Sequence, residues 1–366
     1  MKRILLLSIL LPAVLNAANW PSWRGDLAGS GVSSETDLPT EWSKDKNVAW
    51  RVELPDKGNS TPIIWENRVF ITQAIEAENW RGVMCFNRED GKLLWKKGVT
   101  YAEAERTHRG NPYCSASAST DGEIVVASYG SAGVAAYDFE GNEIWDRKFP
   151  AIDHTWGNST SPVLYGNLVI HYHGPAKDAF LTALDKKSGE TVWEWKEPVW
   201  APENRTDGFQ GRDDEGVIGS WSTPIIVGDD LVMSFPMEMK GFNPKTGEVN
   251  WTTDGLNPLV YTSPIAAGET VIAMGGYHGN TIAAKGGERL WQEVRHHGGI
   301  GTGIVKDGYL YTQNAGGIAY CNEVATGKLI GTTTLLYLPA NLAIDGARQD
   351  RTVRALLDSG ASRSCE

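Results

Sequence analysis

A unit of short β-rich runs, separated by turns and closed by a tryptophan, recurs along most of this chain. In residues 221–251, a small polar start precedes the apolar run 225–227, and Gly228 and Asp229 turn the chain into a second run. Two further runs flank a turn at 243–247. This spacing predicts four antiparallel strands. One such sheet has two apolar faces, so it needs copies of itself on either side.

The copies follow one another along the sequence. Similar units occupy residues 60–95, 115–145, 159–193 and 261–291, and a weaker sixth unit covers 301–331. The closing tryptophans from Trp95 to Trp291 are 50, 48, 58 and 40 residues apart. Periods in this range are typical of propellers and solenoids, and four strands with one aromatic per unit favour the propeller. We therefore predict an all-β fold, a β-propeller of four-stranded antiparallel blades.

The two ends of the sequence depart from the repeat. Lys2 and Arg3 precede an apolar run and small residues, which predicts a secretory signal peptide over residues 1–18. The repeat body then covers 19–330, and 331–366 is an off-pattern tail. Because the repeat stops abruptly at Gly331, we expect lost sequence at the C-terminus. The alternative is a natural but unusual terminus.

Two N-terminal segments lie outside the complete units. Residues 19–25 carry Trp20 and Trp23, and we expect them to pack on the outside of the main body. Residues 47–54, with Trp50, resemble the last strand of a unit that has no beginning. Such a strand can complete the final sheet of a ring and leave no open edge.

Composition limits the partners. The net charge of −11 argues against nucleic acid, because phosphate binding needs basic patches. The signal peptide, with no cysteine after its apolar run, predicts a periplasmic or secreted protein without a lipid anchor or stable membrane insertion. Two readings of the cysteines stay open, namely a bridge between Cys85 and Cys114 or buried free thiols; the full set is Cys85, Cys114, Cys321 and Cys365.

The closing hairpin carries a family resemblance. Residues 86–95, FNREDGKLLW, and residues 184–193, LDKKSGETVW, resemble the hairpin of the PQQ-like (pyrroloquinoline-quinone-like) β-propeller repeat. Among such proteins the chain is most similar to BamB-like exported propellers. The resemblance implies seven or eight blades, of which about six are visible here. We interpret the repeated tryptophans as structural wedges between sheets: Trp50, Trp95, Trp145, Trp193, Trp251 and Trp291.

Three classes of function occur on this fold. The resemblance favours a non-catalytic scaffold that binds protein partners, as in outer-membrane protein assembly. A second possibility is a carbohydrate or small-ligand binder that uses the central funnel. The third is a PQQ-dependent dehydrogenase, but the chain lacks the vicinal cysteine pair of those enzymes. We therefore expect no catalytic residues, no metal and no cofactor, with PQQ and Ca²⁺ as the less favoured alternative.

The segments that precede the first strand of each unit supply the candidate ligand residues. These entry segments place histidine, arginine and tryptophan near the expected axis, a combination that suits an anionic or sugar ligand. The alternative is that such histidines cap turns or bind carbonyl groups. The funnel candidates are His108, Arg109, His154, Trp156, Arg295 and His296.

Overall fold

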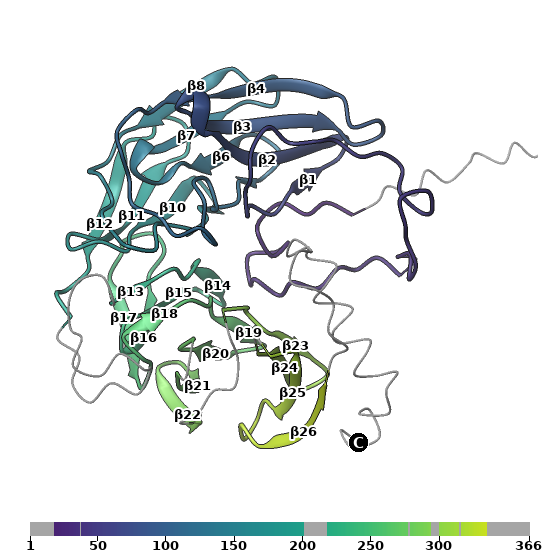
Figure 1. The fold of residues 1–366 in the computed structure, drawn as a ribbon. Coiled ribbons are helices and arrows are strands. Elements are labelled where there is room, and N and C mark those ends of the chain that lie inside the picture. Colours follow the sequence, from purple (N-terminus) through teal and green to yellow (C-terminus); the bar gives the residue numbers. More distant parts are fainter. Residues whose placement is uncertain are drawn as a thin grey trace, which may run out of the picture.

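The computed structural model describes residues 18–36, 38–200, 218–276, 279–293, 300–314 and 316–334. The predicted signal peptide, except for Ala18, lies outside these ranges, as does the tail beyond residue 334. The described part contains six four-stranded sheets, each a meander in chain order. Figure 1 shows them following one another in an arc, with the first sheet at one end and the sixth at the other. This confirms the predicted propeller architecture.

The first three sheets, called blades 1 to 3, come from residues 63–196. Two 3₁₀ turns, η1 (Glu76–Glu78) and η2 (Gly130–Ala132), lie between strands. Blade 1 comprises β1 (Ile63–Trp65), β2 (Arg68–Ile75), β3 (Trp80–Asn87) and β4 (Leu93–Thr100). Blade 2 comprises β5 (Ser119–Thr120), β6 (Val125–Ser128), β7 (Val134–Tyr137) and β8 (Glu143–Arg147). Blade 3 comprises β9 (Val163–Tyr165), β10 (Leu168–His173), β11 (Phe180–Asp185) and β12 (Thr191–Lys196).

Blades 4 to 6 repeat the arrangement. Blade 4 comprises β14 (Ile225–Val227), β15 (Asp230–Phe235), β16 (Glu238–Phe242) and β17 (Val249–Asp254). Blade 5 comprises β19 (Ile265–Ala267), β20 (Thr270–Met274), β21 (Thr281–Lys285) and β22 (Glu288–Glu293). Blade 6 comprises β23 (Ile304–Lys306), β24 (Tyr309–Gln313), β25 (Ile318–Glu323) and β26 (Leu329–Thr334). A short parallel pair, β13 (Gly219–Ser220) and β18 (Leu259–Val260), joins the segments that lead into blades 4 and 5.

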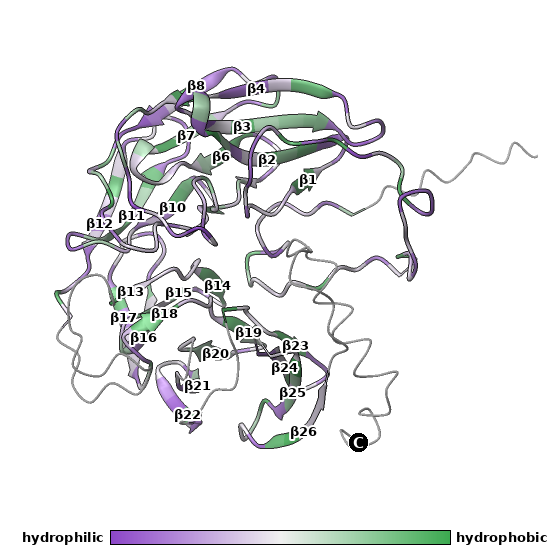
Figure 2. Cartoon of the chain, in the orientation of Figure 1, coloured by the Kyte–Doolittle hydropathy of each residue, from purple (hydrophilic) through white to green (hydrophobic). Residues whose placement is uncertain are grey.

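Each blade buries its apolar faces against its neighbours. Between blades 2 and 3, for example, Val126 and Val134 meet Val169 and Leu184, all fully buried. Equivalent clusters lie between each of the other neighbouring pairs. Figure 2 shows hydrophobic colouring on inner strands such as β2 and hydrophilic colouring on the outer strand β22. Burial of apolar surface between sheets is thus the main force that holds the blades together.

The repeated tryptophans link each blade to the next through the hairpin turn. The Trp95 indole N–H donates to the carbonyl of Phe139 at 2.9 Å, and the Trp145 indole donates to Lys186 at 2.9 Å. Gly189 lies under Trp145 with φ +70°, and a Cβ there would come within 2.7 Å of the indole. Glycine is therefore required both for the turn and for the close approach. Trp251 differs, because its indole N–H donates to Asp230 of its own blade at 2.6 Å.

Residues 47–54 occupy the position of a preceding blade without forming a strand. Trp50 packs over Gly91 in the blade 1 turn and donates to the carbonyl of Arg88 at 2.7 Å, as four of the other five repeat tryptophans do in their neighbouring blades. With Leu54, it covers the otherwise open face of blade 1 around Met84. The segment has no ladder partner among the described residues.

None of the cysteines that the structure describes forms a disulfide. Cys85, Cys114 and Cys321 are buried thiols, so the suggested bridge between Cys85 and Cys114 is absent. Burial raises the pKa of Cys85 to about 12. A buried thiol with a raised pKa holds its proton and is chemically inert. Cys365 lies outside the described residues.

Candidate functional site

The first strands of the blades lie side by side around the axis, and they define two axial ends. β1 contacts β5, β5 contacts β9, and β19 contacts β23. Each first strand runs from its entry segment to its first turn, so these two features lie at opposite ends of the axis. We call the first the entry-segment end. We call residues 19–31 the strap, and we call the other end, which this segment crosses, the strap end.

A chain of hydroxyl groups connects the first strands of all six blades. In blades 2 to 6, a Ser or Thr at the start of the first strand accepts a hydrogen bond from the backbone N–H of its counterpart in the preceding blade, and the series begins at the N–H of Thr61 in blade 1. The donor-to-acceptor distances lie between 2.8 and 3.1 Å. The six members are Thr61, Ser117, Ser161, Thr223, Ser263 and Thr302. This hydroxyl chain satisfies backbone N–H groups that would otherwise be buried without partners.

At the entry-segment end, neighbouring loops hold one another. The Asn59 amide donates to the carbonyl of Gly110 at 2.7 Å. The Asn111 amide donates to the carbonyls of Trp156 at 2.7 Å and Asn158 at 3.3 Å. In turn, the Trp221 indole donates to the carbonyl of Gly157 at 2.8 Å. The loops before blades 1 to 4 therefore form one connected surface, although each contact reaches only the next loop.

The predicted funnel residues fall into three groups in the structure. His108 and Arg109 are exposed at a loop tip, where His108 Nδ1 accepts the N–H of Gly110 at 3.1 Å. His154 is buried and Trp156 half-buried in the adjacent loop. Arg295 and His296 lie outside the described residues. The structure thus places the loops of the first two groups next to each other, through the Asn111 amide and the carbonyl of Trp156.

His154 lies inside an aromatic cluster. Its ring is 5.0 Å from Trp221, edge to face, and 5.9 Å from Trp156. Tyr261, from the loop before blade 5, lies 5.3 Å from Trp221. The two nitrogens of His154 lie within hydrogen-bonding distance of the Ile218 carbonyl and the N–H of Trp156. His154 is 2% exposed and joins its own entry segment to the one before blade 4, and Tyr261 extends the aromatic cluster to the segment before blade 5.

Two buried histidines lie just below this surface, on β10. His171 and His173 are side by side with ring centroids 6.0 Å apart, and Phe149 packs on both. His173 Nε2 lies 2.8 Å from the carbonyl of Pro150. Burial lowers the pKa of His171 to about 3 and that of His173 to about 4. Both rings are therefore neutral at physiological pH.

A buried ion pair anchors the loop that leads into blade 2. Arg81 binds Glu105, and both side chains are 5% exposed. The guanidinium lies 4.0 Å from the ring centre of Tyr113 and 4.7 Å from that of Tyr101. It also donates to the carbonyl of Tyr129 at 3.1 Å. The charge is thus compensated by a carboxylate and two aromatic faces, which fixes the loop between β4 and β5.

The opposite end is crossed by the strap. Trp20 exchanges backbone hydrogen bonds with Ile64 of blade 1, both at 2.8 Å. The carbonyl of Pro21 accepts the N–H of Thr120 in blade 2 at 2.8 Å. The carbonyl of Leu27 accepts the N–H of Ile226 in blade 4, also at 2.8 Å. Our expectation that this segment packs on the outside is therefore wrong, because it lies across the innermost strands.

Arg24 connects the strap to blade 6. Its guanidinium donates to the carbonyls of Thr302 at 3.4 Å and Gly303 at 2.7 Å. It also donates to two carbonyls of the strap itself, at Gly29 and Ser30. The side chain is 4% exposed, and burial lowers its pKa to about 10. It remains charged at neutral pH, so one cation joins the chain's beginning to its last described blade.

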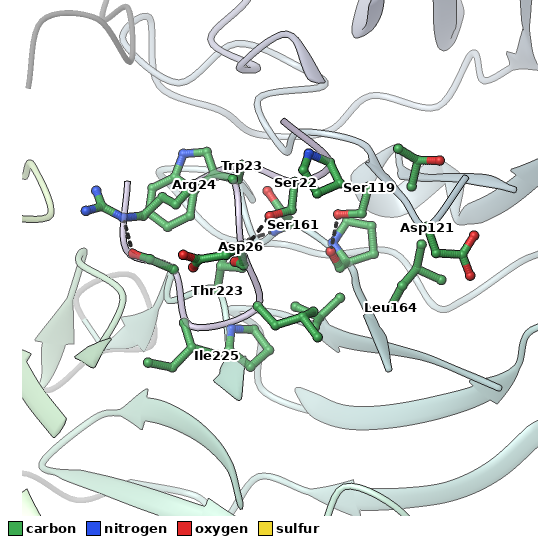
Figure 3. A pocket seen from close by; sticks show the side chains of 18 of the residues that line it. Ser22, Trp23, Arg24, Asp26, Ser119, Asp121, Ser161, Leu164, Thr223 and Ile225 are labelled. Carbon is green, nitrogen blue, oxygen red and sulfur yellow. Dashed lines mark hydrogen bonds between the residues drawn. The ribbon is translucent and has the colours of Figure 1, made fainter. Parts of the chain in front are cut away.

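A cavity of about 280 Å³ lies between the strap and the first strands of blades 2 to 4. Figure 3 shows Ser161 and Thr223 beside Asp26 of the strap, while the Arg24 guanidinium points away from them. The apolar part of the wall includes Trp23, Trp65 and Leu164. None of these residues was among the predicted ligand residues. The available signal was the recurrence of Ser or Thr before proline at the start of the first strands, as in Ser161-Pro162 and Thr223-Pro224.

The metal-ligating side chains do not cluster in the part of the chain that the structure describes. Within the described ranges, no group of three or more His, Cys, Asp or Glu side chains could hold a metal ion. Among the same residues, no helix has the length and apolar character needed to cross a membrane.

Comparison with solved structures supports the fold. BamB from Moraxella catarrhalis shares 16% identity and a TM-score of 0.54, over 78% of this chain and 79% of that one. A europium-containing methanol dehydrogenase has 14% identity and a TM-score of 0.49, over 87% of this chain and 58% of that one. The quinohemoprotein alcohol dehydrogenase from Comamonas testosteroni has 13% identity and a TM-score of 0.47, over 88% and 74%. Only the BamB structure has a TM-score above 0.5, and at 16% identity its likeness to this chain concerns the fold alone.

The family is established by a sequence model. No curated protein matches the chain. A family model described as "Outer membrane protein assembly factor BamB" matches residues 30–154 and 80–333, which together span most of the sequence. The match includes all six blades and the hairpins from which the resemblance was inferred. The chain therefore belongs to this BamB-like family of PQQ-like repeat propellers.

Proposed function

We propose that this protein is an exported, non-catalytic scaffold that binds protein partners at its entry-segment end. The family description, a factor in outer membrane protein assembly, supports partner binding as the general role. The proposal extends it to this chain and to one end of the propeller. It involves no quinone and no Ca²⁺, and it places the protein in the periplasm or outside the cell.

The observation that carries the proposal is the connected loop surface of blades 1 to 4. Asn59, Asn111 and Trp221 tie each entry loop to the next, so the surface is ordered before a partner arrives. A pre-ordered surface loses little conformational entropy on binding. His108 and Arg109 project from it as exposed polar groups, and Trp156 is half-buried behind them. Half-exposed tryptophan and arginine are the residues that most often dominate protein interfaces.

Site-specific photo-crosslinking tests this assignment. A photoreactive amino acid at Arg109 should form adducts with envelope proteins of the source cell. The same probe at Val192, which is 50% exposed on the outer strand β12 of blade 3, is the matched control. We expect discrete adducts from position 109 and few from position 192. Equal labelling from both positions, or none from 109, would contradict the proposal.

A further inference from the structure

We infer that the cavity beneath the strap is a binding site for a small neutral sugar or polyol. This site lies at the opposite axial end from the proposed partner surface, and it does not depend on that function. The cavity volume, about 280 Å³, is close to the lower end of ordinary ligand pockets, roughly 300 Å³. It therefore suits a ligand of monosaccharide size better than an extended one.

Two buried hydroxyl groups provide the polar side of the site. The oxygens of Ser161 and Thr223 accept backbone N–H groups within the hydroxyl chain, at 3.0 and 3.1 Å. Neither hydroxyl hydrogen has an acceptor among the described residues. Ser161 is 2% exposed and Thr223 8% exposed, and both line the cavity. Two neighbouring O–H donors are thus free to bind an acceptor oxygen of a ligand.

The charged groups around the cavity are already compensated. Asp121 binds Lys186 at 2.7 Å and accepts two backbone N–H groups. Asp26 accepts the N–H and the hydroxyl of Ser30 at 2.9 and 2.6 Å. Arg24 is bound by four carbonyl groups, as described above. An ionic ligand would find no unpaired opposite charge here, so a neutral ligand is favoured.

The rest of the wall is aromatic and aliphatic. Trp23 comes from the strap and Trp65 from the end of β1, while Leu164 and Ile225 come from blades 3 and 4. Sugar rings present apolar C–H faces and polar hydroxyl edges. A wall of tryptophan and aliphatic groups opposite hydroxyl donors matches both parts of such a molecule.

Calorimetric titration of the full chain with a panel of neutral monosaccharides and polyols tests the site. The matched charged sugars, a uronic acid and an amino sugar, are included in the same panel. We expect at least one neutral member to bind, and its charged counterparts to bind at least tenfold more weakly. Failure of every neutral sugar and polyol to bind would overturn the inference, as would equal binding of a charged counterpart.

The hydroxyl chain itself offers a matched pair of variants. Ser161→Ala and Ser263→Ala each remove one acceptor from the hydroxyl chain. The first leaves the N–H of Ser117 without its acceptor, and the second does the same to the N–H of Thr223. Of these two serines, Ser161 lines the cavity and Ser263 does not. We expect Ser161→Ala to weaken ligand binding by roughly tenfold and Ser263→Ala to leave it unchanged. An equal effect of both variants would place the ligand elsewhere and overturn the assignment.

A third variant keeps the test decisive if the serine variants fold poorly. Trp65 is half-buried at the cavity wall, outside the hydroxyl chain. Trp65→Leu removes the aromatic face and should weaken sugar binding by roughly tenfold. Binding that is unchanged in this variant would show that the ligand does not contact the wall, which contradicts the proposed site.

Discussion

The strap end and the entry-segment end of the propeller are held together in different ways. At the strap end, one segment crosses the axis and bonds to blades 1, 2, 4 and 6. At the entry-segment end, each loop bonds only to the next one. A contact between distant blades resists opening of the whole arc, whereas neighbour contacts resist only local movement. The comparison indicates that the strap end holds distant blades together, whereas the contacts at the entry-segment end order only neighbouring loops.

The largest expected effect comes from removing the link between the strap and blade 6. Arg24→Ala deprives four carbonyl groups of a charged donor, which should lower the free energy of unfolding by about 3–5 kcal/mol. Arg109→Ala at the exposed entry loop is the matched control and should change it by less than about 0.5 kcal/mol. Urea unfolding followed by tryptophan fluorescence measures both. If the two variants lost similar amounts of unfolding free energy, the strap end would not stabilise the fold more than the entry-segment end does.

Acid should weaken the region below the entry-segment end. The folded pKa values of His171 and His173 are about 3 and 4, below the ordinary value of 6.5. As pH falls below 6.5, the unfolded chain therefore binds protons that the folded chain does not. The contribution of the two neutral histidines to the free energy of unfolding is fully present above pH 6.5. It falls toward pH 4 by on the order of 1 kcal/mol per pH unit for each histidine.

The matching variant isolates this effect. His171→Phe keeps a ring against Phe149 and cannot titrate, so it should remove about half of the pH dependence in this window. Urea midpoints at pH 7 and pH 5 provide the measurement. If the variant and the native protein lose stability equally between these pH values, the acid sensitivity has another origin.

The smallest effect is expected within the entry loops. Asn111→Ala removes two hydrogen bonds to the blade 3 entry loop and should lower stability by about 1–2 kcal/mol. Asn59→Ala, at an exposed position with one such bond, should cost less than about 1 kcal/mol. Thermal unfolding of both variants is sufficient. A loss for Asn59→Ala as large as that for Arg24→Ala would contradict the account of local contacts.

The sequence predicts the repeated part of the molecule well and the unrepeated part poorly. A tryptophan and a turn glycine recur in five of the six units, so contacts such as that of Trp145 with Gly189 follow from the pattern. Arg24 has no counterpart in any repeat, and its partners Thr302 and Gly303 are more than 270 residues away. No local periodicity contains that information, which is why the strap was predicted on the outside.

The candidate site shows the same limit at the level of single residues. His154 and His108 look equivalent in sequence, each in a polar entry segment, yet one is buried among aromatic rings and the other is exposed. Burial depends on which loop packs above, and this is set by Trp221, more than sixty residues away. The cavity was missed for a related reason, because the strap supplies eight of its nineteen lining residues.

Hydrogen exchange at three backbone amides tests the role of the strap most directly. Ile64, Thr120 and Ile226 belong to three different blades, and the backbone N–H of each donates to a carbonyl group of the strap. If the strap is one unit held by Arg24, then Arg24→Ala should speed exchange at all three together. The fully buried β10 amide of Ile170 should keep its relative protection in the same experiment. Unchanged exchange at the three strap-bonded amides would contradict the account.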